Sequence, residues 1–149
     1  MRWFLLVVTL LTLAGCGQKG PPQAGGVSTD LLKVVVLRRD AGGMTEQDAF
    51  RAVLLVTNDF GYEITLERVE FIGRVGKKTA PGAVEHLDVA LPAGQTTELR
   101  LSTVLGWKDD APMSFERGAM EGTLYYSGPK GKIHGMPFSL SGDLDVRGQ

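Results

Sequence analysis

Between residues 31 and 146 the sequence alternates apolar and polar residues with a period of two, and this pattern limits the possible folds more than any other feature. Successive side chains of a β-strand point to opposite faces of a sheet, so a strand with one buried face shows this period. Seven segments are predicted strands. Two of them, 31–39 and 50–58, are runs rich in β-branched residues, and the others are 64–71, 85–91, 97–105, 119–126 and 132–146. The sequence therefore predicts an all-β domain, an antiparallel β-sandwich of about seven strands.

Turn-forming residues mark the boundaries between these segments. Turns are predicted at 58–61, 79–82, 92–94 and 127–131, where glycine, proline, asparagine and aspartate gather. One strand is irregular, because its apolar phase slips by one residue at Glu67-Arg68, which predicts a β-bulge. The best candidate for a helix is the short segment Thr45–Phe50, in which Thr45 and Asp48 resemble a capping box.

The segment 52–82 and the strands after it resemble a known domain family. The strand Val53–Val56 runs into Asn58-Asp59-Phe60, a Pro-Ala-Gly turn within Leu91–Thr97 leads into the next strand, and the chain finishes with Gly135–Val146. These motifs resemble the type 2 late-embryogenesis-abundant (LEA-2) domain, also called the water stress and hypersensitive response (WHy) domain. The resemblance implies an immunoglobulin-like or fibronectin type III-like sandwich, no catalytic residues, and a link with desiccation and stress tolerance.

One motif departs from the family pattern. The family commonly has Asn-Pro-Asn where this chain has Asn58-Asp59-Phe60. Asn58 can still form an Asx-turn with the backbone two residues on. Asp59 cannot fix φ as proline does, so we expect a looser turn.

The N-terminal residues have the pattern of an export signal. One basic residue precedes the apolar run Trp3–Leu13, and the small residues Ala14 and Gly15 lead to Cys16, the only cysteine. The run is too short for a transmembrane helix, which needs about 20 apolar residues. A buried core helix would fit the length, but the run has no polar face. Leu13-Ala14-Gly15-Cys16 resembles the lipobox of bacterial lipoproteins, in which the cysteine is acylated.

This resemblance divides the chain into three parts. Residues 1–15 are the expected signal peptide, residues 16–29 are the acylated cysteine and a flexible Gly/Pro tether, and residues 30–149 are the folded domain. A thioether-linked diacylglyceryl group, and usually an amide-linked acyl chain such as palmitate, would anchor Cys16. Gly17 stands where an aspartate would favour retention in the inner membrane. By resemblance, we expect an envelope protein anchored in the outer membrane and facing the periplasm.

The first residues carry a second resemblance. Residues 13–22 are similar to the start of a very short lipoprotein that assists lipopolysaccharide transport assembly. We interpret this similarity as a shared signal for export and tethering rather than as a shared function.

The charge of the domain argues against polyanionic partners. It contains all 17 acidic residues and 14 of the 16 basic residues, so its net charge is −3. It has no run of like charges. We expect no nucleic-acid partner.

The sequence offers little chemistry for catalysis. The only cysteine is expected to be acylated, and His86 and His134 lie on separate predicted strands with outward phases. Asp143 and Asp145 share one face of a strand, but no loop of calcium-binding spacing surrounds them, so solubilising charges explain them better. We expect no enzyme activity, no metal, no cofactor and no small-molecule substrate.

The long loop after the predicted strand 97–105, which includes the pattern-free stretch 109–118, holds the best candidate for an interaction patch. Trp107, Met113 and Phe115 could form an exposed apolar surface that contacts a partner. Alternatively, Trp107 covers the end of the core, and this second interpretation is favoured.

Two functional hypotheses follow. The first is a membrane-anchored lipoprotein that makes protective or binding contacts with envelope or client proteins, in connection with desiccation or water stress. The alternative is an accessory lipoprotein of an outer-membrane or secretion assembly, in which an edge strand pairs with a partner.

Overall fold

The computed structural model describes residues 26–38, 48–105 and 117–148, and within them it contains strands and no helix. The strands are β1 (Val27–Arg38), β2 (Asp48–Asn58), β3 (Ile64–Val75), β4 (Lys78–Thr79), β5 (Ala83–Leu91), β6 (Thr96–Leu105), β7 (Arg117–Ser127) and β8 (Ile133–Gly148). The predicted all-β class is confirmed, and each of the seven predicted segments overlaps one strand. Residue 132 precedes β8, and residue 39 lies outside the described residues.

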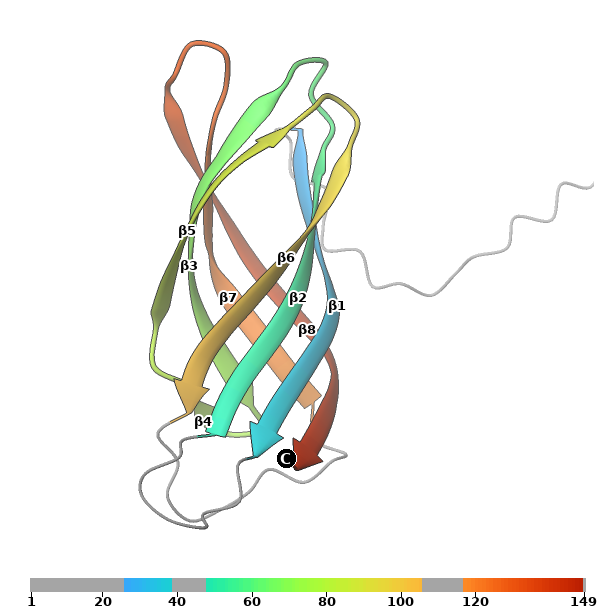
Figure 1. Cartoon of the computed structure of the whole chain (residues 1–149), viewed down its shortest axis with the longest axis vertical. Helices are drawn as coiled ribbons and strands as arrows, with labels where there is room; N and C mark the ends of the chain where they lie inside the picture. The colour runs from blue at the N-terminus through green and yellow to red at the C-terminus, as the bar shows by residue number, and fades with distance from the viewer. Residues whose placement is uncertain (1–25, 39–47, 106–116, 149) are drawn as a thin grey trace, which may run out of the picture.

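The strands form one strongly curled sheet in the order β4-β3-β7-β8-β1-β2-β6, with β5 also paired to β3 (Figure 1). Strand β8 joins the two halves. Its first part, from Ile133 to Asp143, pairs with β7, and its last part, from Leu144 to Gly148, pairs with β1. The pairing of β1 with β8 is parallel, whereas all the other pairs are antiparallel, as predicted.

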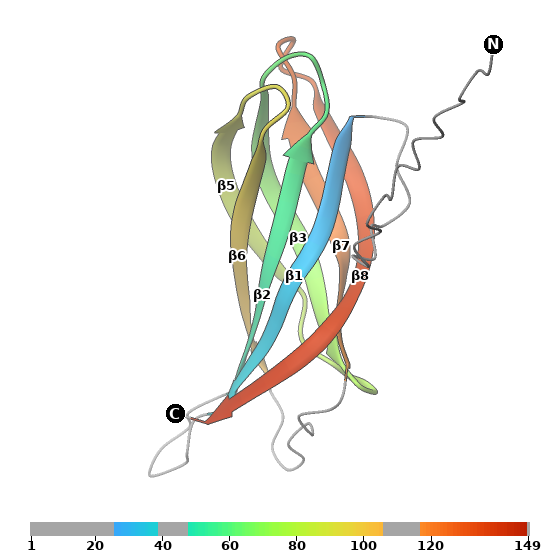
Figure 2. The same cartoon turned by 90° about the vertical axis from the view of Figure 1, so that its right-hand side faces the viewer.

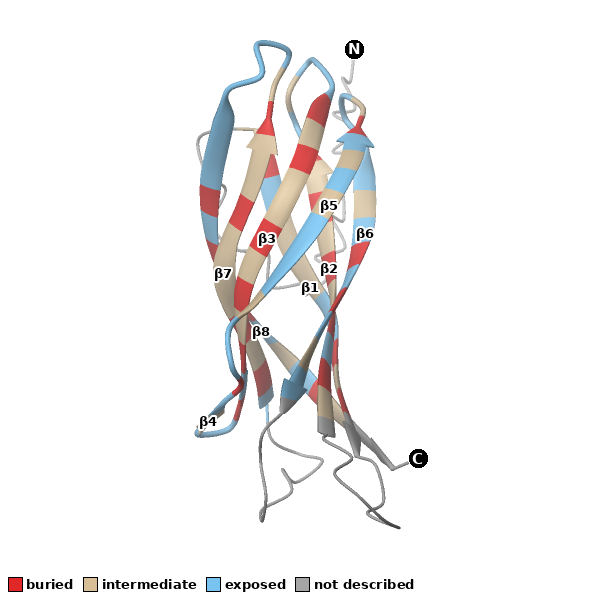
Figure 3. Ribbon diagram, turned by 60° about the vertical axis from the view of Figure 1, so that its left-hand side comes forward, coloured by how far each residue is buried: buried red, intermediate tan, exposed pale blue. Residues whose placement is uncertain are grey.

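The core lies inside the curl of the sheet. Alternate residues of each long strand point inward, so buried residues recur along the strands (Figure 3). The residues with no exposed surface are Val34, Val36, Phe50, Leu54, Val56, Asn58, Leu66, Val69, Met120 and Leu124. Complete burial of a large apolar side chain contributes about 1.5–3 kcal/mol, so this period-two pattern is the main source of stability.

The predicted β-bulge at Glu67 is confirmed. The pairing of β3 with both β5 and β7 shifts register between Leu66 and Arg68. On β5, Asp88 has a φ of 49°, the left-handed conformation that accompanies such irregularities. Because β5 pairs only with β3 among the described strands, the irregularity also interrupts an edge that could otherwise pair with another chain.

Two boundaries differ from the sequence prediction. Strand β1 begins at Val27, whose side chain is buried and which pairs with Asn58, so Val27–Thr29 belong to the folded domain rather than to the tether. Asp48–Phe50 form the start of β2, so the helix predicted at Thr45–Phe50 is wrong over these residues. Phe50 is a core residue of the strand, and its burial outweighs the local capping pattern.

Candidate functional site

Three turns and the start of β1 meet at one end of the domain (Figure 2). The turns are β2–β3, β5–β6 and β7–β8, and the C-terminal end of β8 lies at the opposite end. We call the end that contains Val27 the tether-proximal end, because the residues from Cys16 to the domain are continuous with it. A backbone hydrogen bond from Asp59 to the carbonyl oxygen of Gly26, at 2.6 Å, fastens the β2–β3 turn to the entering chain.

This bond requires a residue other than proline at position 59. Proline has no backbone N–H group, so it could not donate the hydrogen bond that Asp59 donates to Gly26. The Asp59 carboxylate also accepts a hydrogen bond from the Ser28 hydroxyl, at 3.3 Å. The turn is therefore held by contacts with the N-terminal residues in place of the rigidity that proline supplies.

The buried side chain of Asn58 bonds to several backbone groups at the same end of the domain. Its side chain is completely buried, and its amide nitrogen donates to the carbonyl oxygens of Tyr62, Leu91 and Pro92 at 2.9, 2.9 and 3.1 Å. Its amide oxygen accepts from the backbone N–H of Phe60 at 3.0 Å, which is the predicted Asx-turn. One side chain thus joins the β2–β3 turn to the end of β5.

Four aromatic rings pack against one another above Asn58. Phe60 stacks on Tyr62 with ring centroids 4.9 Å apart, and Phe60 and Tyr126 are 6.0 Å apart. Tyr126 in turn stacks on His134 across the β7–β8 hairpin, at 5.6 Å. Burial, and secondly the nearby Tyr62, raises the pKa of the Tyr126 phenol above its ordinary value. Phe60 and Tyr126 also pack against the buried core residues, so the cluster closes this end of the core.

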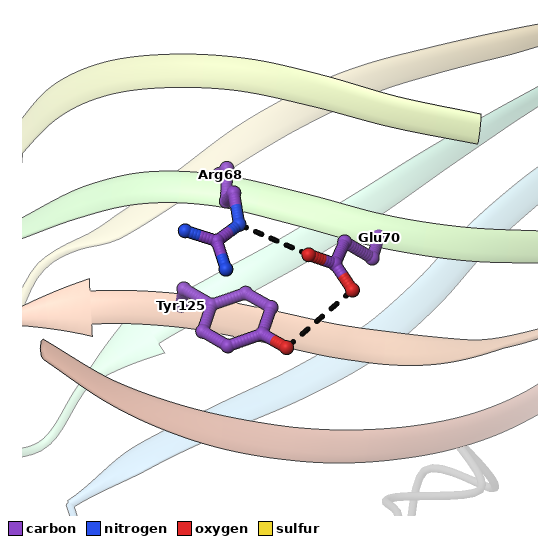
Figure 4. Close-up of polar contacts among 3 residues, drawn as sticks. All are labelled: Arg68, Glu70 and Tyr125. Atoms are coloured by element: carbon purple, nitrogen blue, oxygen red, sulfur yellow. Dashed lines mark hydrogen bonds and ion pairs between the residues drawn. The ribbon is translucent and has the colours of Figure 1, made fainter.

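A polar cluster lies on the outer face of β3 and β7 (Figure 4). Arg68 donates to the Glu70 carboxylate at 3.0 Å, and its guanidinium lies 3.9 Å from the centroid of the Tyr125 ring. The Tyr125 hydroxyl donates to the other oxygen of Glu70, at 3.4 Å. The hydrogen bond to Glu70 raises the pKa of Arg68. The three groups satisfy one another at the surface, so the arrangement supports the sheet rather than presenting a reactive group.

The predictions for the other titratable residues can be compared with the structure. His86 and His134 are exposed and lie on separate strands, as predicted. The outward phase predicted for His134 is wrong, because it shares the phase of the buried residues Met136 and Phe138 on β8. Asp145 forms an ion pair with Lys33 at 3.7 Å. In the part of the chain that the structure describes, no three His, Cys, Asp or Glu residues are grouped so that they could hold a metal ion. Tyr125 and Tyr126 face opposite sides, as expected from their adjacency in a strand.

The site residues predicted from the sequence lie outside the described residues. These are the lipobox and acylation site, Leu13, Ala14, Gly15 and Cys16, and the candidate patch, Trp107, Met113 and Phe115. The aromatic cluster at the tether-proximal end was not predicted. Its members come from the β2–β3 turn and the β7–β8 hairpin, which are far apart in the sequence, and the only local signal was the presence of Phe60 and Tyr62 within a turn.

The N-terminal residues match a lipoprotein family. Residues 3–21 match the conserved region of the LPS-assembly lipoprotein LptM. The match confirms the second resemblance found in the sequence and supports a lipidated envelope protein. No curated protein matches the chain. Among the residues with described structure, no helix is long and apolar enough to cross a membrane.

The domain has the fold of several solved structures. The solution structure of AT1g01470 from Arabidopsis thaliana is 15% identical, with 95% of this chain and 93% of that chain covered and a TM-score of 0.58. A protein described as late embryogenesis abundant (LEA), At2g46140.1, is 16% identical over 82% of this chain and 72% of that chain, with a TM-score of 0.57. The structural-genomics target SoR45 is 16% identical, with 77% of this chain and 85% of that chain covered and a TM-score of 0.54. At these identities the likeness is one of fold, and the fold is LEA-like.

Proposed function

We propose that this chain is a membrane-anchored lipoprotein whose LEA-2-like domain makes protective or binding contacts in the cell envelope, in connection with desiccation or water stress. The observation that carries the proposal is the union of a lipoprotein N-terminus, at residues 3–21, with a LEA-like fold. The proposal includes the finer assignment to the LEA-2 family, with its immunoglobulin-like sandwich, and a position in the outer membrane facing the periplasm.

We further propose that the protein acts without catalysis, cofactor or small-molecule substrate. The most prominent polar cluster, Arg68, Glu70 and Tyr125, is internally satisfied and supports the sheet surface. The two histidines are exposed and apart, without the partners that acid–base catalysis requires. A binding role needs only the surface of the domain and its position at the membrane.

The experiment has two parts. Bacteria producing the full chain are labelled with radioactive palmitate, and we expect the label on the wild-type protein but not on Cys16→Ser. The strain lacking the gene is then dried and rehydrated, and the purified protein is tested for limiting the aggregation of an unrelated enzyme during drying. Labelled protein with normal survival and no protection would refute the stress role while leaving the anchor intact.

The alternative is an accessory lipoprotein of an outer-membrane or secretion assembly. Two observations favour it: the N-terminal match to an LPS-assembly lipoprotein, and the edge strand β6, which pairs only with β2 among the described strands. Its outward residues, such as Glu98, Arg100 and Ser102, are exposed, and an added strand could pair along this edge. Crosslinking in intact membranes tests it, because an assembly factor has a stoichiometric partner and a general protectant has none.

A further inference from the structure

The position of the anchor determines which end of the domain faces the bilayer. Ten residues follow Cys16 up to Gly26, where the described structure begins. A chain of this length spans at most about 36 Å when extended, and about 17 Å on average as a Gly-rich coil. Strand β1 alone is roughly 40 Å long at 3.3 Å per residue. The tether-proximal end is therefore held near the membrane, and the opposite end can be well clear of it.

The β7–β8 turn presents basic and apolar side chains at this end. Lys130 and Lys132 are exposed, and 51% of the surface of Ile133 is exposed. Tyr62 is 44% exposed and lies beside the same turn, since a Cβ atom built on Gly128 would be 3.4 Å from its ring. Lysines, an aliphatic side chain and an amphipathic tyrosine are the residues that bind at a membrane interface.

The two lysines are available to a partner. Neither Lys130 nor Lys132 forms an ion pair with any residue that the structure describes. The exposed acidic residues Asp59 and Glu63 lie on the neighbouring β2–β3 turn, so the positive charge is confined to the β7–β8 turn. This local charge complements an anionic surface even though the whole chain has a net charge of −1.

The turn is also held in place. Gly131 donates a backbone hydrogen bond to the carbonyl oxygen of Gly128 at 2.9 Å, and Ser127 pairs with Ile133 at the end of the ladder. Behind it, the stacked rings of Tyr126 and His134 hold the hairpin against the core. The backbone of the turn is thus held in place, which lowers the entropic cost of binding.

We propose that the β7–β8 turn, residues 128–133, together with Tyr62, is a second membrane contact that binds anionic phospholipid headgroups. The inference rests on the lipid anchor of the proposed function and adds an orientation to it. The acyl chains hold the protein at the bilayer, and the turn sets the domain upright on it. The opposite end, where β8 finishes, then faces away from the membrane toward any partner.

The experiment uses the mature lipidated protein reconstituted into vesicles. Because Cys16 is the only cysteine and is acylated, a cysteine introduced elsewhere is the only free thiol. An environment-sensitive fluorophore is attached to Ile133→Cys or, as the matched control, to Val84→Cys. Val84 is 55% exposed and lies near the start of β5, toward the opposite end. The vesicles contain phosphatidylcholine alone or with 30% phosphatidylglycerol, with nitroxide lipids as quenchers.

We expect the fluorophore at position 133 to be quenched by nitroxide lipids in the anionic vesicles, and the fluorophore at position 84 to be unaffected. Replacing both lysines, as Lys130→Gln with Lys132→Gln, should weaken the contact about 30-fold, as expected for two basic residues near an anionic surface. Circular dichroism melts of each variant show whether the domain is still folded.

Three results would overturn the proposal. In the first, the protein floats with the vesicles, but the fluorophore at position 133 is quenched no more than the one at position 84. This result would refute the second contact without contradicting the anchor or the proposed function. In the second, the fluorophore at position 133 is quenched equally in neutral vesicles, which would indicate a non-ionic contact. In the third, its fluorescence without vesicles changes with protein concentration, which would indicate contact with a second copy of the chain. If the protein does not float with the vesicles, the anchor is absent and both proposals fail together.

Discussion

Replacing Asn58 by alanine should destabilise the domain more than any other single polar substitution among the described residues. Its side chain is completely buried and contacts four backbone groups: its two amide N–H donors are shared among three carbonyl oxygens, and its amide oxygen accepts from one backbone N–H. Alanine removes all of these contacts, one of which, to the carbonyl oxygen of Leu91, is buried. The two turns that Asn58 joins would then be linked only by backbone bonds.

The magnitude follows from these contacts. The side chain uses two N–H donors and one accepting oxygen, so a net contribution of about 1 kcal/mol for each predicts a loss of about 3 kcal/mol for Asn58→Ala. That is a large share of the roughly 5–15 kcal/mol that stabilises a typical domain. At about 4 °C for each kcal/mol in a domain of this size, the melting temperature should fall by roughly 12 °C.

Asn58→Asp tests the direction of the hydrogen bonds. Aspartate has nearly the same shape, but its carboxylate cannot donate to the three carbonyl oxygens. Burial among these oxygens raises the pKa of the introduced carboxyl in the folded state above its unfolded value of about 3.9. The folded state then binds more protons, so the stability of this variant should fall as the pH rises from about 4 to 7.

Urea unfolding of the mature protein in detergent, followed by circular dichroism, measures both variants. Ser28→Ala is the matched control, because it removes a hydrogen bond at the same end that is exposed and 3.3 Å long. It should cost less than about 0.5 kcal/mol. A loss below about 1 kcal/mol for Asn58→Ala, or a stability of Asn58→Asp that does not depend on pH, would refute the reasoning.

Three further changes test other parts of the structure. Leu54→Ala should lower the free energy of unfolding, measured in urea, by about 3–5 kcal/mol because Leu54 has no exposed surface. Leu32→Ala, at a site 60% exposed, should lower it by less than about 0.5 kcal/mol. Equal losses would contradict the core assignment. Gly122→Ala should lower the melting temperature strongly because a Cβ atom there would overlap the backbone of β3, while Gly61→Ala, with nothing within 4 Å, should leave it unchanged. The pKa of Tyr126 is raised in the folded state, so its contribution to stability is complete below its unfolded pKa of about 10 and is lost as the pH rises through its folded pKa. Between pH 9 and 11 the melting temperature should therefore decline more steeply for the wild type than for Tyr126→Phe.

The strands could be predicted from the sequence because their signal is local. Residues such as Leu99 and Leu101 alternate with Glu98 and Arg100, and burial of one face follows directly from this period. The bulge at Glu67 was predictable for the same reason, since a slip in phase is visible within one strand.

The joining of the two sheet halves could not be predicted in this way. The parallel pairing of β1 with β8 brings together Val34 and Leu144, and nothing in either segment specifies the partner. The tether-proximal aromatic cluster was missed for a similar reason, because Phe60 and Tyr126 meet only after β3 has paired with β7. Long-range contacts of this kind depend on the complete set of strands.

The sharing of β8 between β7 and β1 has a consequence for the biosynthesis of the protein. The first strand of the domain gains its parallel neighbour only when the last residues of the chain, Leu144–Gly148, have been made. Pairing between strands this far apart in the sequence forms slowly, because a long loop must close first. For the exported lipoprotein proposed above, slow closure of the sheet would keep the chain in a form that can be threaded through a membrane.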